Sequence, residues 1–449
     1  MLIFRRRWRN SYLFILLYII IFFMVKDSLF GAVQEFFSFI FQSEPKIELA
    51  TVIPTEPPIT IRNVTKRELV LLQVVFRHGH RAPFNLYPND PHPVTFWKEG
   101  LGMLTQLGRL QHYVVGDHLQ KRYKDFITTN PTEVELLSAD ADRCQFGGFA
   151  FVAGLYAPSE NYSFTKELRW QPIISKHYPN RANRFVLSRR KCAVAAAEEH
   201  EWKAGREGED FRNRYRPFYN FWSEHSGRNV KDWTRAADLG KTLACERDYN
   251  LSVPEWGKTY WAQLEEQAGI SYYFNFRTRL IQRYRVGPLI SYLRQKIEQK
   301  VNGTTPDKKV YVYSSHGSNI ACLLLAIGAY NMRAPPHAST LALELWLEDD
   351  RDYSIRWLYF NSSNPEKRMD APFVMPVAGC GEQFCPLDTF FNLTSDLIPG
   401  DYLQECNDFS IRLKFPLPDY IPESSSQRTE LNVIILYIVF IVFIFLNKM

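Results

Sequence analysis

The segment at residues 68–76 constrains the fold more than any other part of the chain. It reads ELVLLQVVF, a continuous apolar run that includes β-branched residues. An unbroken apolar run of this length is typical of a strand buried on both faces, as in a parallel sheet that helices cover on both sides. Residues 68–76 therefore predict a strand of a parallel sheet in an α/β protein.

Further segments alternate between strand and helix patterns. Residues 134–140 (VELLSAD) and 308–315 (KKVYVYSS) have the composition of strands. Residues 105–123 have helical periodicity, and residues 319–330 indicate a buried helix. This alternation predicts an α/β fold with a mostly parallel sheet sandwiched by helices. The charged and aromatic stretch from about 160 to 275 has few strand signals, and it predicts a helical cap inserted over the sheet.

The chain is long enough to bury a large core. With 449 residues, 46% of them hydrophobic, it exceeds the usual single-domain size, so one large domain with an insertion, or two domains, is expected. We place the globular part at residues 66–415. The net charge of +6 is modest and comes largely from four arginines near the N-terminus, so no nucleic-acid partner is predicted.

The first 41 residues have the pattern of a secretory targeting signal. The arginine cluster precedes an unbroken apolar run from Tyr12 to Val25. No clear small-x-small cleavage site follows, so a cleaved signal peptide and a retained signal anchor both stay open. The arginine-rich side is expected in the cytoplasm, and everything after the segment in the lumen or outside the cell. Residues 42–65, rich in Pro and Thr, predict an extended stalk.

The C-terminal end predicts a membrane segment at residues 433–449. Residues 433–446 (VIILYIVFIVFIFL) are apolar throughout, although the run is shorter than the roughly 20 residues of a full span. A lipid-anchor signal is the rival, because three small serines precede the tail. The short spacer and the polar last residues count against that rival. Residues 416–432 would form the tether between the globular part and the membrane.

Six N-x-S/T sequons lie between the two ends and agree with a secretory-pathway ectodomain. They predict glycosylation at Asn63, Asn161, Asn250, Asn302, Asn361 and Asn392. The seven cysteines would then lie in an oxidising compartment, where most should pair and one should be left over. Cys380 and Cys385 are close enough in sequence for a small loop bridge, whereas spacing does not decide the pairing of the others.

Polar residues follow three of the predicted strands. The three strand ends carry Arg77, His78 and Arg81; Asp140, Asp142 and Arg143; and Ser314, Ser315 and His316. Because the carboxyl ends of strands meet at one edge of an open α/β sheet, we expect three arginines and two histidines to lie close together. Such a cluster repels itself unless an anion fills it, and guanidinium groups bind the oxygens of a tetrahedral phosphate in pairs. The strand ends therefore predict a phosphate site.

A histidine at such a site can act as a nucleophile. Neighbouring arginines lower its pKa, so an uncharged, attacking imidazole persists in mildly acidic solution. The same cations neutralise the oxygens of the phosphoryl group during its transfer. A competing interpretation takes His78 and His80 as an H-x-H metal pair. That pattern is weak without a nearby acidic ligand, and the flanking arginines disfavour a cation, so no metal site is predicted.

RHGHRAP, at residues 77–83, matches the R-H-G-x-R-x-P signature of the histidine acid phosphatases. The chain resembles the branch of this family that contains the prostatic and lysosomal acid phosphatases. Further segments occur in the family's order and rough spacing: LTQLGRLQHYVVGDHLQKRY, SADADR, VYSSHGS, PPHAS and CPLDTF. The resemblance implies a phosphoglycerate-mutase-like fold and the hydrolysis of small phosphate monoesters without a metal or another cofactor. It leaves a homodimer open.

The resemblance also implies roles for particular residues. His78 would be the nucleophile that forms a phosphohistidine, and His316 would donate a hydrogen bond to the phosphate. Arg77, Arg81 and Arg143 would bind the phosphate oxygens.

The chain departs from the family at the residue after the second histidine. The family has an aspartate there that protonates the leaving oxygen, whereas this chain has Gly317, which cannot donate a proton. Loss of a general acid costs on the order of 10²- to 10⁴-fold for a poor leaving group and much less for a good one. His80, Ser315, Ser318 or a water are substitutes that the sequence leaves open.

The cysteines follow the family only in part. The resemblance implies two disulfide bonds, Cys192 with Cys406 and Cys380 with Cys385. The family's partner for Cys245 falls at Thr340, so Cys245 pairs with Cys144 or Cys322, or one of these stays free.

Two functions follow from these residues. The first is a membrane-anchored acid phosphatase with a weakened or rerouted acid step. The second is a catalytically impaired membrane protein that binds a phosphorylated ligand. The intact nucleophile and phosphate ligands favour the enzyme, because a pure binder has no need of the nucleophile.

Overall fold

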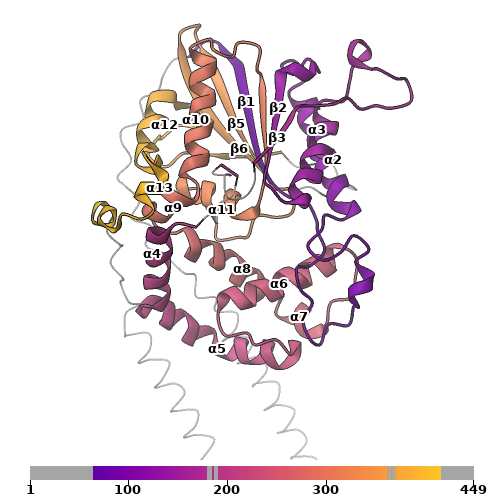
Figure 1. Ribbon diagram of the computed structural model, residues 1–449, viewed down its shortest axis with the longest axis vertical. Helices are drawn as coiled ribbons and strands as arrows, with labels where there is room; N and C mark the ends of the chain where they lie inside the picture. The colour runs from indigo at the N-terminus through magenta and orange to yellow at the C-terminus, as the bar shows by residue number, and fades with distance from the viewer. Residues whose placement is uncertain are drawn as a thin grey trace, which may run out of the picture. The chain divides into compact units, whose positions relative to one another are not determined.

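The computed structural model describes residues 64–178, 185–186, 191–361, 364, 369 and 371–415 (Figure 1). The predicted N-terminal signal region, nearly all of the stalk, the tether and the C-terminal membrane segment lie outside these residues. Among the residues that are described, no helix is both long enough and apolar enough to span a lipid bilayer.

A mixed β-sheet forms the centre of the described part. Its strands are β1 (Arg67–Arg77), β2 (Val134–Ser138), β3 (Ser175–His177), β4 (Val310–Ser315), β5 (Thr340–Glu348), β6 (Asp352–Phe360), β7 (Phe373–Met375) and β8 (Cys385–Pro386). The order is β3-β2-β4-β1-β5-β6-β7, and β8 pairs with β6. Strands β3, β2, β4 and β1 run parallel, whereas β5, β6, β7 and β8 pair antiparallel on one side. The predicted α/β fold with a mostly parallel central sheet is confirmed, and antiparallel strands extend it.

Helices surround this sheet. The α-helices are α2 (Gln106–Arg122), α3 (Asp142–Leu155), α4 (Ala193–Ala204), α5 (Arg206–Ser226), α6 (Trp233–Asp248), α7 (Glu255–Thr259), α8 (Trp261–Phe276), α9 (Arg279–Arg285), α10 (Gly287–Val301), α11 (Gly317–Ala326), α12 (Leu387–Leu393) and α13 (Tyr402–Glu405). Short 3-10 helices lie at Val94–Phe96, Pro131–Glu133, Glu160–Tyr162, Ser395–Leu397 and Phe409–Lys414.

Strand β1 is buried on both faces, as its composition indicates. Leu72, Val74 and Phe76 point into a core that α2 and α3 cover, whereas Leu71 and Val75 point into a second core that α10 and α11 cover. Figure 1 shows α2 and α3 on one side of the sheet and α10 on the other. Burial of each such side chain contributes about 1.5–3 kcal/mol, so the two cores hold β1 firmly in place.

In the described part of the predicted cap, the α-helices are α4 to α8. They pack around aromatic side chains such as Trp202, Trp222 and Trp233, which accounts for the dense aromatic composition of this stretch. The helices begin at Ala193, whereas Ser175–His177 in the same stretch form β3 at the edge of the sheet. Helix α8 packs against α11 and α9, so the cap is attached directly to the layer that covers the sheet.

The two disulfide bonds implied by the resemblance are present, Cys192–Cys406 and Cys380–Cys385. The expectation that only one cysteine stays unpaired is wrong. Cys144, Cys245 and Cys322 are all free and buried. They lie on three different helices, α3, α6 and α11.

Candidate active site

The parallel pairing of β1 with β4 brings two distant histidines to one edge of the sheet. Arg77, the last residue of β1, aligns with Ser315, the last residue of β4. The next residue, His78, donates its backbone N–H to the Ser315 carbonyl at 3.0 Å. The rings of His78 and His316 are consequently 5.9 Å apart, centre to centre.

Two glycines allow the loop after β1 to lie against the start of α2. A Cβ atom on Gly79 would come within 2.4 Å of the Gly108 carbonyl oxygen, and one on Gly108 within 2.1 Å of the His80 carbonyl oxygen. Neither position can therefore carry a side chain without moving the backbone. The glycine of the RHGHRAP motif is explained by this contact, which fixes the loop that carries His78.

His78 has a defined tautomer. Its Nδ1 atom lies 3.0 Å from the Gly79 carbonyl oxygen. A carbonyl oxygen only accepts hydrogen bonds, so Nδ1 carries the proton and Nε2 keeps its lone pair. Burial, with the charges of Arg77 and Arg81, lowers the pKa of His78 well below its usual 6.5. The ring therefore remains uncharged in mildly acidic solution, with a nucleophilic nitrogen at Nε2.

Arg81 and Arg143 offer unused donors to a ligand. The Nε atoms of both are buried and have no hydrogen-bond partner among the described residues. The Phe84 ring supports both groups, because its centre lies 3.8 Å from Cζ of Arg81 and 5.0 Å from Cζ of Arg143. Sequence analysis did not identify Phe84, although it follows the motif directly. Buried guanidinium groups with unused N–H donors are suited to an anion.

His316 and Arg143 lie at the N-termini of two helices. His316 is the N-cap residue of α11, and Arg143 lies in the first turn of α3. A helix N-terminus carries a partial positive charge and favours an anion. Burial, followed by the charges of Arg143 and Arg77, lowers the pKa of His316 to about 3. The Cys144 sulfur lies 3.7 Å from its Nδ1 atom and packs against the ring.

Arg77, the last residue of β1, completes the cluster and contacts the loop before β5. Its guanidinium donates a hydrogen bond to the Pro335 carbonyl oxygen, and its charge acts on both His78 and His316. The structure thus brings together the five residues that the sequence placed in the site, Arg77, His78, Arg81, Arg143 and His316.

His80 lies outside this cluster of donors. Its Nδ1 atom is 2.7 Å from the Thr105 hydroxyl oxygen, and its Nε2 atom is 2.9 Å from the Cys245 carbonyl oxygen. Because both ring nitrogens are engaged, His80 and His78 do not form a pair of free metal ligands. The described residues contain no group of three or more His, Cys, Asp or Glu side chains arranged to hold a metal ion.

Two further side chains, one near His78 and one near Gly317, come from parts of the chain to which the sequence assigned no catalytic role. The His337 ring centre lies 6.1 Å from that of His78, and His337 Nδ1 lies 3.4 Å from an Asp248 oxygen. Tyr272 approaches Gly317: a Cβ atom built on Gly317 would lie 3.0 Å from the Tyr272 hydroxyl oxygen. Local sequence carries no signal for the Tyr272 contact, because Tyr272 is on cap helix α8. His337, in the loop before β5, belongs to the segment PPHAS, to which no catalytic role was assigned from the sequence.

The predicted glycosylation sites are on the surface where they are described. Five of the asparagines are exposed, Asn161, Asn250, Asn302, Asn361 and Asn392. Asn63 lies outside the described residues.

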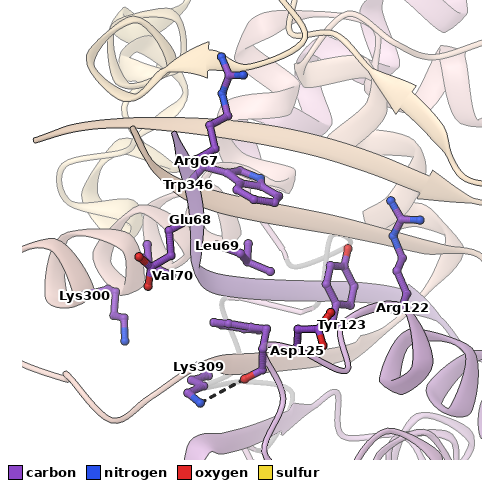
Figure 2. A pocket seen from close by; sticks show the side chains of 11 residues that line it. Arg67, Glu68, Leu69, Val70, Arg122, Tyr123, Asp125, Lys300, Lys309 and Trp346 are labelled. Carbon is purple, nitrogen blue, oxygen red and sulfur yellow. Dashed lines mark hydrogen bonds between the residues drawn. The ribbon is translucent and has the colours of Figure 1, made fainter. Parts of the chain in front are cut away.

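A separate pocket of about 540 Å³ lies at the opposite end of β1 (Figure 2). Ten residues of β1, about 33 Å of strand, separate Arg67 in its wall from Arg77. Its lysines are already engaged: Lys309 Nζ donates to the Phe126 carbonyl oxygen at 3.1 Å, and Lys300 donates to two backbone carbonyls. This pocket contains none of the predicted phosphate ligands.

Comparison with known proteins identifies relatives of this chain. A sequence model described as "Histidine phosphatase superfamily (branch 2)" matches residues 68–360. Human prostatic acid phosphatase is 30% identical over 359 residues, which cover 77% of this chain and 89% of that protein. Bovine lysosomal acid phosphatase is 30% identical over 349 residues, which cover 76% and 80%.

Solved structures show the same fold. The apo form of Hafnia alvei phytase superposes with a TM-score of 0.60 at 17% identity, covering 77% of this chain and 99% of the phytase. The phytase of Citrobacter braakii gives a TM-score of 0.58 at 18% identity, covering 76% and 99%. By its sequence match over residues 68–360, the chain belongs to the histidine phosphatase superfamily, branch 2.

Proposed function

We propose that this chain is an acid phosphatase that hydrolyses phosphate monoesters through a phosphohistidine at His78. The Nε2 atom of His78 attacks phosphorus, and water then hydrolyses the phosphohistidine. Arg77, Arg81 and Arg143 bind the phosphoryl oxygens, and His316 donates a further hydrogen bond. In a loose phosphoryl-transfer transition state, such positioning and charge neutralisation supply most of the rate enhancement.

The tautomer of His78 carries this proposal. A buried, uncharged imidazole with its lone pair at Nε2 is arranged for attack, and the charges around it are arranged for a phosphate. Family membership and the names of the curated relatives, prostatic and lysosomal acid phosphatases, support the same reaction.

Gly317 is the observation that favours a second function. Without a carboxylic acid at that position, protonation of a poor leaving group is weakened, and the limiting case is a protein that binds phosphorylated ligands without turnover. The enzyme is the better supported of the two, because a binding protein gains nothing from a pre-oriented nucleophile.

We also propose that the globular part works in the lumen of the secretory pathway, in a lysosome or outside the cell, held at a membrane by its terminal segments. Two disulfide bonds and five exposed sequon asparagines are compatible with an oxidising, glycosylating compartment.

Trapping of the phosphoenzyme tests the proposed reaction. The purified protein is mixed near pH 5 with a ³²P-labelled activated aryl phosphate, quenched within milliseconds in alkali, which preserves phosphohistidine, and mapped by mass spectrometry. We expect label on His78, and loss of label and turnover in His78→Ala. His200→Ala, which changes an exposed histidine on α4, serves as the control and should keep both. Inorganic phosphate binding by the wild type without label or turnover would establish the binding protein instead.

A further inference from the structure

The space beside Gly317 contains another proton-bearing group. A Cβ atom at this position would lie 3.0 Å from the Oη atom of Tyr272 and 3.0 Å from the Cδ atom of Arg77. The carboxyl group of an aspartate begins one bond beyond Cβ, so the Tyr272 hydroxyl lies within reach of an acid at this position. An O–H group is therefore present beside the residue at which the family resemblance implies the acid.

Tyr272 reaches this point from the cap. It is half-buried on α8, and α8 packs against α11, whose first residue is Gly317. The Tyr272 side chain also interacts electrostatically with the buried guanidinium of Arg81. Arg77 and Arg81 are thus both neighbours of Tyr272, which lies beside the cations that bind phosphate in the proposed reaction.

We propose that Tyr272 is the general acid of this chain and donates its hydroxyl proton to the leaving oxygen in place of the aspartate that Gly317 replaces. This inference rests on the proposed function, since it requires His78 as the nucleophile. Tyrosine is among the side chains that act as general acids, and an ordinary phenol keeps its proton throughout the acidic and neutral range.

The proton balance closes with water as the only other reactant. As Nε2 of His78 forms its bond to phosphorus, the bond from phosphorus to the ester oxygen breaks, and that oxygen takes the proton of Tyr272. The alcohol leaves, and Arg77 and Arg81 stabilise the phenolate. Water then attacks phosphorus and gives its proton to the phenolate, the P–N bond breaks, and inorganic phosphate is released. Tyr272 and His78 return to their starting states.

His337 is the rival donor, and its surroundings make it a poor one. Its ring lies against His80, 5.3 Å between centres, and its Nδ1 faces Asp248. Burial, followed by the charges of Arg77, Arg81 and Arg247 and by the neighbouring His80, lowers its pKa well below the usual value. His337 is therefore uncharged in mildly acidic solution, and a neutral imidazole is a weak acid.

Leaving-group dependence tests the role of Tyr272. We expect Tyr272→Phe to lose about 10²- to 10⁴-fold in kcat/KM on an alkyl phosphate and less than about 10-fold on an activated aryl phosphate, whose leaving oxygen needs no proton. Tyr273→Phe removes the same hydroxyl from the next residue of α8 and should lose little with either substrate. Equal losses on both substrates in Tyr272→Phe, or an alkyl-selective loss in His337→Asn instead, would overturn the assignment.

Variants that remove the hydroxyl of Tyr272 and introduce a carboxyl group at position 317 give an independent check. Gly317→Asp alone should not raise alkyl phosphate turnover, because its Cβ atom would lie 3.0 Å from both the Tyr272 hydroxyl oxygen and Arg77 Cδ, so that these two side chains crowd the new residue. Tyr272→Leu should lose alkyl turnover, and adding Gly317→Asp to it should restore at least 10-fold, since the new carboxyl group then has room. A gain in Gly317→Asp alone that equals the gain in the double variant would count against Tyr272 as the occupant of this place.

Measurement of phosphoenzyme formation distinguishes a failure of this inference from a failure of the proposed function. If Tyr272→Phe forms the His78 phosphoenzyme from the aryl phosphate at the wild-type rate and loses only alkyl turnover, both statements hold. If the wild type forms no phosphoenzyme, the proposed function itself fails. If the phosphoenzyme forms and Tyr272→Phe hydrolyses alkyl phosphates normally, only the assignment of Tyr272 fails.

Discussion

The Cζ atom of Arg81 lies 3.8 Å from the centre of the Phe84 ring. This stacking holds a buried guanidinium that has no carboxylate within ion-pair distance among the described residues, and the same ring also lies near Arg143. An exposed aromatic ring, 51% accessible, thereby orients two of the proposed phosphate ligands.

Removal of the Phe84 ring should weaken phosphate binding. A cation–π contact contributes about 0.5–2 kcal/mol, so we expect Phe84→Leu to raise the inhibition constant for inorganic phosphate about 2- to 30-fold. Competitive inhibition of aryl phosphate hydrolysis measures this constant. Phe146→Leu, at a similarly exposed phenylalanine on α3, is the control, and an equal effect in both variants would refute a specific role for Phe84.

The charge of Arg77, together with burial, should lower the acidic limit of the reaction. Because the folded-state pKa of His78 is lowered, the nucleophile stays unprotonated below pH 6.5, and activity falls only as the pH drops through the lowered value. Arg77→Gln removes the charge that, after burial, lowers this pKa most, so the acidic limb of the kcat/KM profile should move to higher pH. Arg109→Gln, on the exposed side of α2, should leave it unmoved with the same aryl phosphate.

His112 should make the fold sensitive to acid. Burial lowers its pKa to about 3, so the folded state binds fewer protons than the unfolded state between pH 3 and 6.5, and stability falls as the pH drops through this window. Between pH 7.5 and 5 this loss amounts to about 2 kcal/mol. His112→Leu should lose correspondingly less over that interval in urea unfolding. His200→Leu at an exposed site should follow the wild type, and an unchanged pH dependence in His112→Leu would exclude this explanation.

The two disulfide bonds should differ in their contribution to stability. Cys192–Cys406 joins residues 214 positions apart, whereas Cys380–Cys385 spans five. On the chain-entropy model the longer loop contributes about 5 kcal/mol and the shorter about 2 kcal/mol. Paired Cys→Ser replacement at the first bond should therefore lower the unfolding midpoint in urea more than replacement at the second. The reverse order would mean that native-state contacts, not loop closure, dominate.

Much of the fold could be predicted from local composition. The run at 68–76 is strand β1, and the polar residues after β1, β2 and β4 meet because parallel strands end at one edge. The antiparallel strands were not predicted. In β5 the charged Glu344 interrupts the apolar pattern, yet it is buried and accepts hydrogen bonds from Arg356 and Tyr123. A strand pattern of this kind depends on partners far away in the sequence.

The candidate site also contains residues whose proximity the sequence predicts and residues whose proximity depends on the tertiary fold. Arg77, His78 and Arg81 belong to one motif, so their proximity follows from the sequence alone. Tyr272 reaches Gly317 only because α8 packs on α11, and that contact depends on the tertiary arrangement of the cap. The free cysteines are a similar case, since spacing gives no information about which helix faces which.

The hydrogen bond from His80 Nε2 to the Cys245 carbonyl links the motif loop to cap helix α6. The cap is therefore not a detachable lid over an otherwise complete catalytic centre. Excising residues 193–276 would remove an acceptor that anchors the peptide next to the nucleophile, together with Tyr272. Any shortened variant that omits this stretch should lose the alignment of His78, and it should also expose the core that the cap shares with the sheet.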